Sequence, residues 1–299
     1  MAETRRVGSD PMTDPAHIFD SARPGLVKLA YRMLGSVADA EDVVQTAFLR
    51  WQAVDPASVQ SPPAYLRRIV TRLCLDLHRT TARRREVYLG EWLPDPVVTD
   101  PSEDITLMLM LALERLSPLE RAAFLLHDVF GVPFEEVSGI IDRTPAAARQ
   151  LAARARQNVQ QDNARFSVDA TRGQQIAAAF FAASRAGDMG ALRRLLAEDI
   201  SLHADGGGQR PTVIQPVLGR DAVVQAHAGF ADHFRDNGST LIALTHINGL
   251  PGCISRESDG QLQTTALDIE NGLIRAIYVT RNPDKLRHLK ASDAMPKRH

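Results

Sequence analysis

A helix-turn-helix pattern between residues 117 and 160 constrains the fold of this chain more than any other feature. Residues 117–120, Ser-Pro-Leu-Glu, form a capping box with proline at the first helical position, so a helix begins there. Gly131 can adopt the left-handed conformation that ends a helix, and the apolar spacing of residues 134–141 predicts a short second helix. Thr144, followed by proline, is a typical N-cap for a third helix that runs to about residue 160. These signals predict a small all-α domain.

The third of these helices combines small alanines with polar side chains that can reach DNA. Its polar positions are Arg149, Gln150, Arg154 and Arg156. Arginine and glutamine are the side chains that contact guanine and adenine edges or phosphates in a major groove. The same pattern occurs in ordinary helical bundles, where an arginine face is simply solvated. The local pattern therefore allows both a DNA-binding helix and a solvated surface helix.

Composition bounds the class of protein. The 299 residues with 44% hydrophobic content can build two or three domains. The net charge of −1 argues against a dedicated nucleic-acid binder, but it hides a cluster of seven arginines within residues 67–85 and an acidic stretch within residues 91–104. Cys74 and Cys253 lie far apart, so no disulfide, metal site or cofactor is expected. The chain has no long apolar run and no signal-peptide pattern, which predicts a cytoplasmic protein without a membrane partner.

The N-terminal part is also predicted to be helical. Apolar residues recur at helical spacing in three segments between residues 18 and 77, and the last segment runs into the arginine cluster. The acidic string D-A-E-D-V-V-Q-T-A-F, Asp39–Phe48, opens the second segment. Carboxylates at that point stabilise the positive end of the helix dipole, so a purely structural role and a binding role both remain open.

Three motifs together resemble one known family. The acidic string, the aliphatic helix ending in R-R-R and the capped S-P-L-E-R-A segment are similar to the two-domain extracytoplasmic-function sigma factors, over residues 17–160. The resemblance implies that one set of side chains binds the clamp helices of the largest subunit of core RNA polymerase: Asp39, Asp42, Gln45 and Phe48. It also implies that promoter DNA is a partner, with the −10 element contacted by Arg68, Arg72 and Arg79. The −35 element would be read by Arg149, Gln150 and Arg154, with Arg156 on the backbone.

The connector between the two helical regions carries an unusual motif. The segment Glu91–Pro96, E-W-L-P-D-P, places an aromatic residue and a leucine within an acidic stretch. Trp92, Leu93 and Pro94 are therefore expected to have a docking partner, although they can also cap the core of the first domain. A W-L-P-x-P connector followed by a long C-terminal extension resembles the subgroup of these sigma factors that carries a fused SnoaL-like domain.

The C-terminal part is predicted to be an α+β domain. Helical patterns are followed by a strand near residue 201, a helix after Gly219 and β-rich segments at residues 241–247, 263–269 and 273–279. Asn271-Gly272 is a strong hairpin signal between the last two. Helices followed by a curved antiparallel sheet indicate a cone, and this arrangement resembles the SnoaL-like or NTF2-like fold.

Two further motifs in this part are routine surface turns by their composition. They are D-G-G-G-Q-R, with Asp205, Gly206, Gly207, Gly208 and Arg210, and N-P-D-K-L, beginning with Asn282, Pro283 and Asp284. Both resemble signatures of the fused subgroup, and the resemblance implies that the first faces the connector. Gln209 stands where the subgroup has lysine, so a salt bridge is lost there unless Arg210 replaces it.

The expected organisation is multidomain: two all-α sigma domains and then the cone. The predicted parts are a flexible tail (1–15), sigma region 2 (16–88), a linker (89–104), sigma region 4 (105–165), a SnoaL-like domain (171–290) and a second tail (291–299). The expected function is promoter-specific transcription initiation, modulated by the protein's own C-terminal domain as an intramolecular partner.

Two alternatives and one further partner stay open. The chain can be a helix-turn-helix regulator with a ligand-binding domain, or a SnoaL-like enzyme fused to a DNA-binding module. Pocket candidates for an enzyme are His203, Asp205, Arg210, His227, Asp268 and Tyr278. No pair among them has a spacing that demands catalysis, so the chain is not expected to be an enzyme, and fold alone carries no activity. An unknown small ligand is a further candidate partner of this domain.

Overall fold

The computed structural model describes residues 14–86, 88–100, 106–160 and 169–289. The chain divides into two compact units. Unit 1 comprises Met1–Arg83 and Leu113–Val159, and unit 2 comprises Arg84–Ala112 and Gln160–His299. The predicted linker therefore groups with the C-terminal part of the chain rather than with either helical domain.

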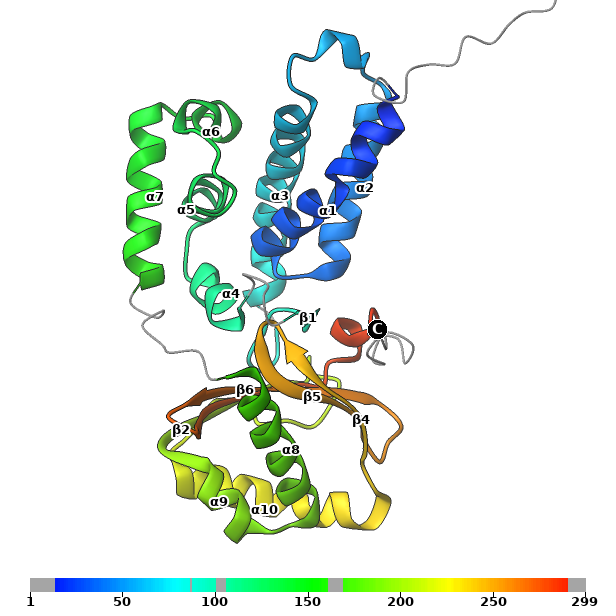
Figure 1. The fold of residues 1–299 in the computed structure, drawn as a ribbon, viewed down its shortest axis with the longest axis vertical. Helices are drawn as coiled ribbons and strands as arrows, with labels where there is room; N and C mark the ends of the chain where they lie inside the picture. The colour runs from blue at the N-terminus through cyan, green and yellow to red at the C-terminus, as the bar shows by residue number, and fades with distance from the viewer. Residues whose placement is uncertain (1–13, 87, 101–105, 161–168, 290–299) are drawn as a thin grey trace, which may run out of the picture. The chain divides into compact units, whose positions relative to one another are not determined.

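The N-terminal half of unit 1 consists of three long helices, as predicted. They are α1 (Pro15–Leu34), α2 (Val37–Gln52) and α3 (Pro62–Glu86), with a 3-10 turn η1 (Pro56–Ser58) between the last two (Figure 1). Gly35 adopts φ of 70° and ends α1, and the Ser36 side chain accepts a hydrogen bond from the amide of Asp39 to begin α2. Trp51 is fully buried, and its indole nitrogen donates to the carbonyl of Pro15 at 2.8 Å. The second helix is thereby fixed against the first.

The second half of unit 1 is the helix-turn-helix region. It contains α5 (Pro118–Phe124), α6 (Phe134–Ile141) and α7 (Pro145–Gln160). The predicted capping box is present, because the Glu120 amide donates to Ser117 Oγ at 3.4 Å and the Ser117 amide donates to Glu120 Oε2 at 3.1 Å. One detail differs: the expected single helix changes to a π-helical turn, η2 (Leu125–Val129), before Gly131.

A preceding helix, α4 (Leu107–Glu114), was not predicted. Its sequence, L-M-L-M-L-A-L-E, is apolar all round, so it shows no helical period. Its first six residues group with unit 2 and its last two with unit 1.

A buried arginine joins the two halves of unit 1. The Arg121 side chain is 2% exposed, donates to the carbonyl of Met33 at 2.7 Å and lies 3.1 Å from Glu114. A buried charge needs such partners, since its transfer from water is costly. In unit 1 the helix-turn-helix region therefore packs against α1.

Unit 2 is built on a seven-stranded sheet in the order β1-β4-β5-β6-β7-β2-β3. The strands are β1 (Val98–Thr99), β2 (Leu196–Asp205), β3 (Val217–Leu218), β4 (Thr240–Ile247), β5 (Leu250–Arg256), β6 (Leu262–Glu270) and β7 (Leu273–Thr280). The expectation of an antiparallel sheet was wrong at one pair, because β2 runs parallel to β7. The chain passes from β2 to β7 through β3, α10, β4, β5 and β6 rather than through a hairpin, which permits the parallel pairing.

Helices cover one face of this sheet. They are α8 (Ala170–Ala186), α9 (Met189–Leu195) and α10 (Arg220–Asn237), and Figure 1 shows them below the strands. Alternate residues of β7 serve the two faces: Ile277 packs with the helices, whereas Ala276 and Tyr278 pack with Leu93 of the connector. The helices and the curved sheet form the predicted α+β cone, and the connector occupies its other face.

Candidate functional site

The predicted polymerase-binding residues lie on α2, but not all are equally accessible. Asp42 and Gln45 are exposed, whereas Asp39 is half-buried near the N-terminus of the helix. Phe48 is also half-buried and packs against Phe19, with ring centroids 4.8 Å apart. Leu49 is 58% exposed and falls on the face of Asp42 and Gln45, at spacings of seven and four residues. This leucine was not among the predicted contacts, although its helical spacing from Asp42 and Gln45 indicates it.

The predicted −10 contacts lie on α3. Arg68, Arg72 and Arg79 are all exposed. Arg72 donates to the carbonyls of Ile140 and Gly139, each at 3.2 Å, so its guanidinium also contacts the C-terminal end of α6. Arg79 pairs with Asp76 on the same helix at 3.5 Å. The three arginines present cations along one helix.

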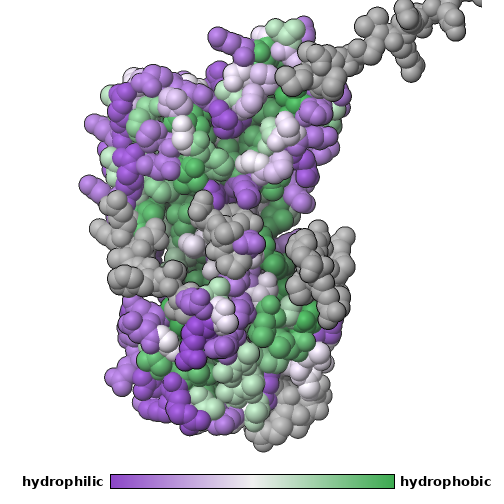
Figure 2. All heavy atoms as spheres, in the orientation of Figure 1, coloured by the Kyte–Doolittle hydropathy of each residue, from purple (hydrophilic) through white to green (hydrophobic). Residues whose placement is uncertain are grey.

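The predicted −35 helix, α7, separates a buried face from an exposed one. Ala148, Ala152, Ala155 and Val159 are buried, whereas Gln150 and Arg154 are exposed. Arg149 lies 2.9 Å from Glu135, and Arg156 lies 2.5 Å from Asp128. Hydrophilic residues line the outer side of α7 in Figure 2. Gln150 and Arg154 thus lie on the solvent-exposed face of α7, and the two arginines paired with carboxylates lie beside them.

Within unit 2 the connector, taken here as residues 88–99, docks on the C-terminal domain through one buried carboxylate, Asp205. This side chain is fully buried. Its Oδ1 accepts from the Tyr88 hydroxyl and from the Gly207 amide at 3.0 Å, and its Oδ2 accepts from the Leu93 amide at 3.0 Å. Lys285 Nζ lies 2.8 Å from Oδ2. Burial and the neighbouring carboxylate raise the pKa of the Tyr88 phenol, which keeps it a hydrogen-bond donor. We call Asp205, Lys285, Asn282 and Gly207 the connector seat.

Lys285 holds the aromatic part of the connector. Its ammonium group lies 3.8 Å from the centroid of the Trp92 ring and donates to the carbonyl of Leu93. Trp92 is half-buried and Leu93 is buried in the cluster that includes Tyr278. A desolvated ammonium over an indole ring is a favourable cation–π contact. Charge and apolar burial therefore act together on the W-L-P-D-P segment.

The glycines of D-G-G-G-Q-R permit this close approach. Gly207 has φ of 62°, and a Cβ placed on it would lie 2.3 Å from Asn282 Nδ2. That amide group donates to the Tyr88 hydroxyl at 2.8 Å. A Cβ on Gly208 would come within 3.2 Å of Leu89. A side chain at position 207 would therefore occupy the space of the group that binds the connector.

The downstream part of the connector joins the sheet. Val98 and Thr99 form β1 and pair with Ile247 and His246 of β4. The Asn248 side chain accepts from the Val97 amide at 2.6 Å. The Leu107 amide donates to the carbonyl of Asn248 at 2.6 Å. The region between residues 88 and 99 is thus held at both ends.

Two residues of this surface, Gln209 and Arg210, have partners outside the connector. Arg210 does not replace the missing lysine at the connector, because its guanidinium group lies 2.7 Å from Asp259. Gln209 donates to Asp284 at 2.9 Å, which leaves a hydrogen bond in place of a salt bridge. Pro283 begins a 3-10 turn, η3 (Pro283–Leu286), that positions Lys285.

Comparison with known proteins identifies the family. Residues 18–84 match the model of Sigma-70 region 2, and residues 106–159 match Sigma-70, region 4. The ECF RNA polymerase sigma factor SigJ of Mycobacterium tuberculosis is 39% identical over 89% of this chain and 91% of its own length. The chain belongs to the extracytoplasmic-function sigma factors.

A second relative and a solved structure agree with this assignment. The probable ECF sigma factor SigI of M. tuberculosis is 31% identical over 90% of this chain and 93% of its own length. The crystal structure of M. tuberculosis SigJ superposes with a TM-score of 0.71 and 35% identity, covering 90% of this chain and 97% of that one. The likeness therefore extends through the C-terminal unit of this sigma factor.

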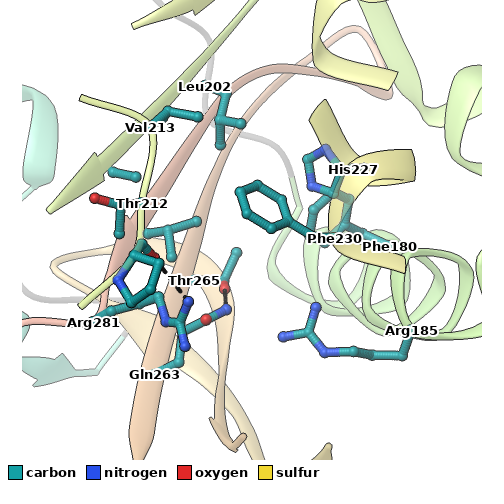
Figure 3. Close-up of a pocket in the computed structure, with 13 residues that line it drawn as sticks. Phe180, Arg185, Leu202, Thr212, Val213, His227, Phe230, Gln263, Thr265 and Arg281 are labelled. Atoms are coloured by element: carbon teal, nitrogen blue, oxygen red, sulfur yellow. Dashed lines mark hydrogen bonds between the residues drawn. The ribbon is translucent and has the colours of Figure 1, made fainter. Parts of the chain in front are cut away.

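The pocket candidates for an enzyme have different surroundings in this sigma factor. Asp205 binds the connector, and His203 Nδ1 lies 2.8 Å from Glu91 of the connector. Tyr278 stacks on His203 with ring centroids 4.9 Å apart, while Asp268 is a buried residue of β6. Among the six candidates, only His227 lines a cavity that lies on the helix side of the sheet (Figure 3). The candidates are thus not gathered in one pocket.

Within the described ranges, no three histidine, cysteine, aspartate or glutamate side chains are placed to hold a metal ion. Over the same residues, no helix has the length and apolar character needed to cross a membrane.

Proposed function

We propose that this sigma factor binds core RNA polymerase in the cytoplasm and directs initiation at its own promoters. The exposed face of α2, with Asp42, Gln45 and Leu49, supports polymerase binding, because carboxylate and amide groups surround an accessible leucine. Interface energy concentrates in such an apolar centre with a polar rim. The clamp helices of the largest polymerase subunit are the proposed partner. Half-buried Asp39 and Phe48 shape this face from within.

Promoter DNA is the second proposed partner. Exposed Arg68, Arg72 and Arg79 suit phosphates near the −10 element, and Gln150 and Arg154 suit base edges of the −35 element. Arg149 and Arg156 are paired with carboxylates at the protein surface. Pairs of this kind contribute only about 0–1 kcal/mol, so both arginines can exchange their carboxylates for phosphates.

We further propose that the C-terminal domain regulates initiation through the connector seat. The observation that carries this proposal is Asp205, a fully buried carboxylate whose partners include Tyr88 and Leu93 of the connector. The connector joins the two DNA-binding regions along the chain. A seated connector has less free length than a released one, in which each residue spans up to about 3.3–3.6 Å. Seating therefore biases which arrangements of the two regions the polymerase can select.

The test is promoter-dependent transcription with core RNA polymerase. Four proteins are compared: the full chain, a chain that ends at Ala164, and the full-length variants Lys285→Met and Arg287→Met. Truncation uncovers buried Leu93 and Leu107, so the point variants are needed to separate regulation from loss of folding. Arg287 is the matched control, since its side chain is 78% exposed and pairs with Asp284.

We expect Lys285→Met to change transcription in the same direction as the truncation, and Arg287→Met to behave as the full chain. Equal activity of all four proteins would remove the regulatory proposal while leaving the sigma function intact. Absence of any binding to core polymerase would remove the sigma function itself.

A further inference from the structure

Two rings are stacked at the turn of the helix-turn-helix region. The His127 imidazole, from η2, and the Phe134 ring, at the start of α6, have centroids 3.8 Å apart and an interplanar angle of 25°. His127 Nδ1 lies 2.9 Å from the carbonyl oxygen of Val132, and this nitrogen donates because a carbonyl can only accept. The hydrogen bond orients the imidazole, and the stack in turn restricts the Phe134 ring.

The Phe134 ring also contacts Arg149, on α7. The guanidinium carbon of Arg149 lies 5.5 Å from the centroid of this ring, within the range of a cation–π contact. A long arginine side chain loses conformational freedom when it binds a partner, and a ring that holds it beforehand lowers this cost. His127, Phe134 and Arg149 therefore form one series of contacts that leads from the turn to an exposed position of α7.

The Glu135 carboxylate shows where an oxyanion lies on Arg149. Glu135 Oε1 is 2.9 Å from Nη2 of Arg149, and the two side chains are 69% and 54% exposed. An ion pair so open to water is weak and is readily exchanged. Guanidinium groups donate to phosphates as they do to carboxylates, through charge-assisted hydrogen bonds. A DNA phosphate can therefore replace the carboxylate while Arg149 keeps its contact with Phe134.

We propose that His127 and Phe134 are positioning residues for Arg149, which they hold ready for one backbone phosphate of the −35 element. The inference rests on the proposed contact between α7 and the −35 element, and it adds two residues that act through Arg149. Phe134 acts by direct contact with the guanidinium group, and His127 acts by orienting Phe134. Loss of the ring at position 134 therefore weakens DNA binding only when Arg149 is present.

A double-mutant cycle tests this dependence. The probe is a promoter duplex that the full chain with core RNA polymerase selects from a library with a randomised −35 element, and the affinity of the holoenzyme for it is measured. We expect Phe134→Leu to weaken binding by roughly two- to fivefold with Arg149 present and to have no effect in the Arg149→Met background. Equal losses in the two backgrounds would assign Phe134 a purely structural role and overturn the proposal.

The salt dependence of the affinity gives a second readout. Each phosphate contact contributes about −0.9 to the slope of log K against the logarithm of the salt concentration. Arg149→Met should remove this contribution and Phe134→Leu part of it, whereas a general structural defect lowers affinity at an unchanged slope. A reduced slope in Arg149→Met alone would overturn the positioning role. An unchanged slope in both variants would overturn the phosphate contact and the proposal with it, while transcription by the unaltered chain would still support the sigma function.

Further full-length variants make the cycle specific. Phe134→Tyr keeps the ring and should bind as the unaltered chain does. Phe130→Leu is the matched control, because the Phe130 ring also lies 5.5 Å from a guanidinium carbon, but that of Arg32 on α1. Its effect should not depend on Arg149, and coupling as large as that of Phe134→Leu would overturn the proposal. If Phe134→Leu does not fold, His127→Gln takes its place, since glutamine removes the stacked ring but keeps a hydrogen-bond donor. Losses from His127→Gln and Arg149→Met that simply add would then refute the positioning role.

Discussion

Replacing Asp205 by asparagine tests the connector seat most directly. The carboxylate is fully buried and accepts from Tyr88, Leu93, Gly207 and Lys285. Asparagine has nearly the same size but only one acceptor oxygen, and its NH₂ group would face donors. The variant also leaves the Lys285 ammonium without its buried counter-charge. Asp205→Asn therefore changes charge and hydrogen bonding with little change in volume.

The expected magnitude follows from the burial of the pair. Removing one partner of a buried ion pair costs about 3–5 kcal/mol, because the remaining charge stays desolvated. Since each 1.4 kcal/mol is a factor of ten, the equilibrium constant for releasing the connector should rise by roughly two to three and a half orders of magnitude. Cleavage or chemical modification of the connector requires its release, so the rate of either depends on this equilibrium constant.

Hydrogen exchange at the Val97 amide measures this release. The amide donates to Asn248 Oδ1 at 2.6 Å and keeps that acceptor in the variant, so faster exchange reports opening of the connector. Amides of the ladder between β5 and β6 report the stability of the sheet. Asp259→Asn is the control, because Asp259 is also a carboxylate between two cations but does not touch the connector. Unchanged exchange at Val97, or equal acceleration in the control, would refute the reasoning.

Three other predictions follow from individual residues. Gly207→Ala should destabilise unit 2 by about 1–3 kcal/mol more than Gly219→Ala in thermal unfolding, because both positions have positive φ but only a Cβ at position 207 would meet Asn282. Equal losses of stability in the two variants would contradict the close-approach argument. Leu49→Asp should weaken binding to core polymerase by roughly 10- to 100-fold, as expected for losing about 1.5–3 kcal/mol of leucine burial, while Leu218→Asp on β3 should leave binding unchanged. Similar affinities of the two variants for core polymerase would exclude the α2 face as the binding surface. Burial lowers the pKa of His227 below the unfolded value of about 6.5, so the unfolded state binds more protons and stability falls as pH drops through that value. His227→Gln should therefore unfold with a smaller loss of melting temperature on acidification, and an unchanged pH dependence would show that other groups cause it.

Local signals predicted most of the helical part correctly. The capping box at Ser117 and the N-cap at Thr144 act within one turn, so the residues themselves determine where α5 and α7 begin. The Asn271-Gly272 hairpin was also predicted, with φ of 53° and 79° at the two positions. Such features need no knowledge of the tertiary structure.

Features that depend on tertiary pairing were not predictable in the same way. β5 contains Pro251 and Gly252, which weaken any strand pattern, although Asn248-Gly249 before it has the same hairpin chemistry as the predicted turn. β1 is only two residues long and exists because β4 pairs with it. The role of Asp205 was indicated by family resemblance alone, since nothing in its local sequence shows that Tyr88 and Leu93 donate to it.

The position of β1 has a consequence for gene dosage. This strand comes from the connector yet forms one edge of the C-terminal sheet, so the connector and the domain proposed to control it are parts of one polypeptide. Their ratio is one in every molecule, and the local concentration of the connector at its seat does not change with expression level. Making more of the protein therefore cannot separate the connector from the C-terminal domain. Under the proposed regulation, output per molecule changes only through events that alter the free energy of seating itself.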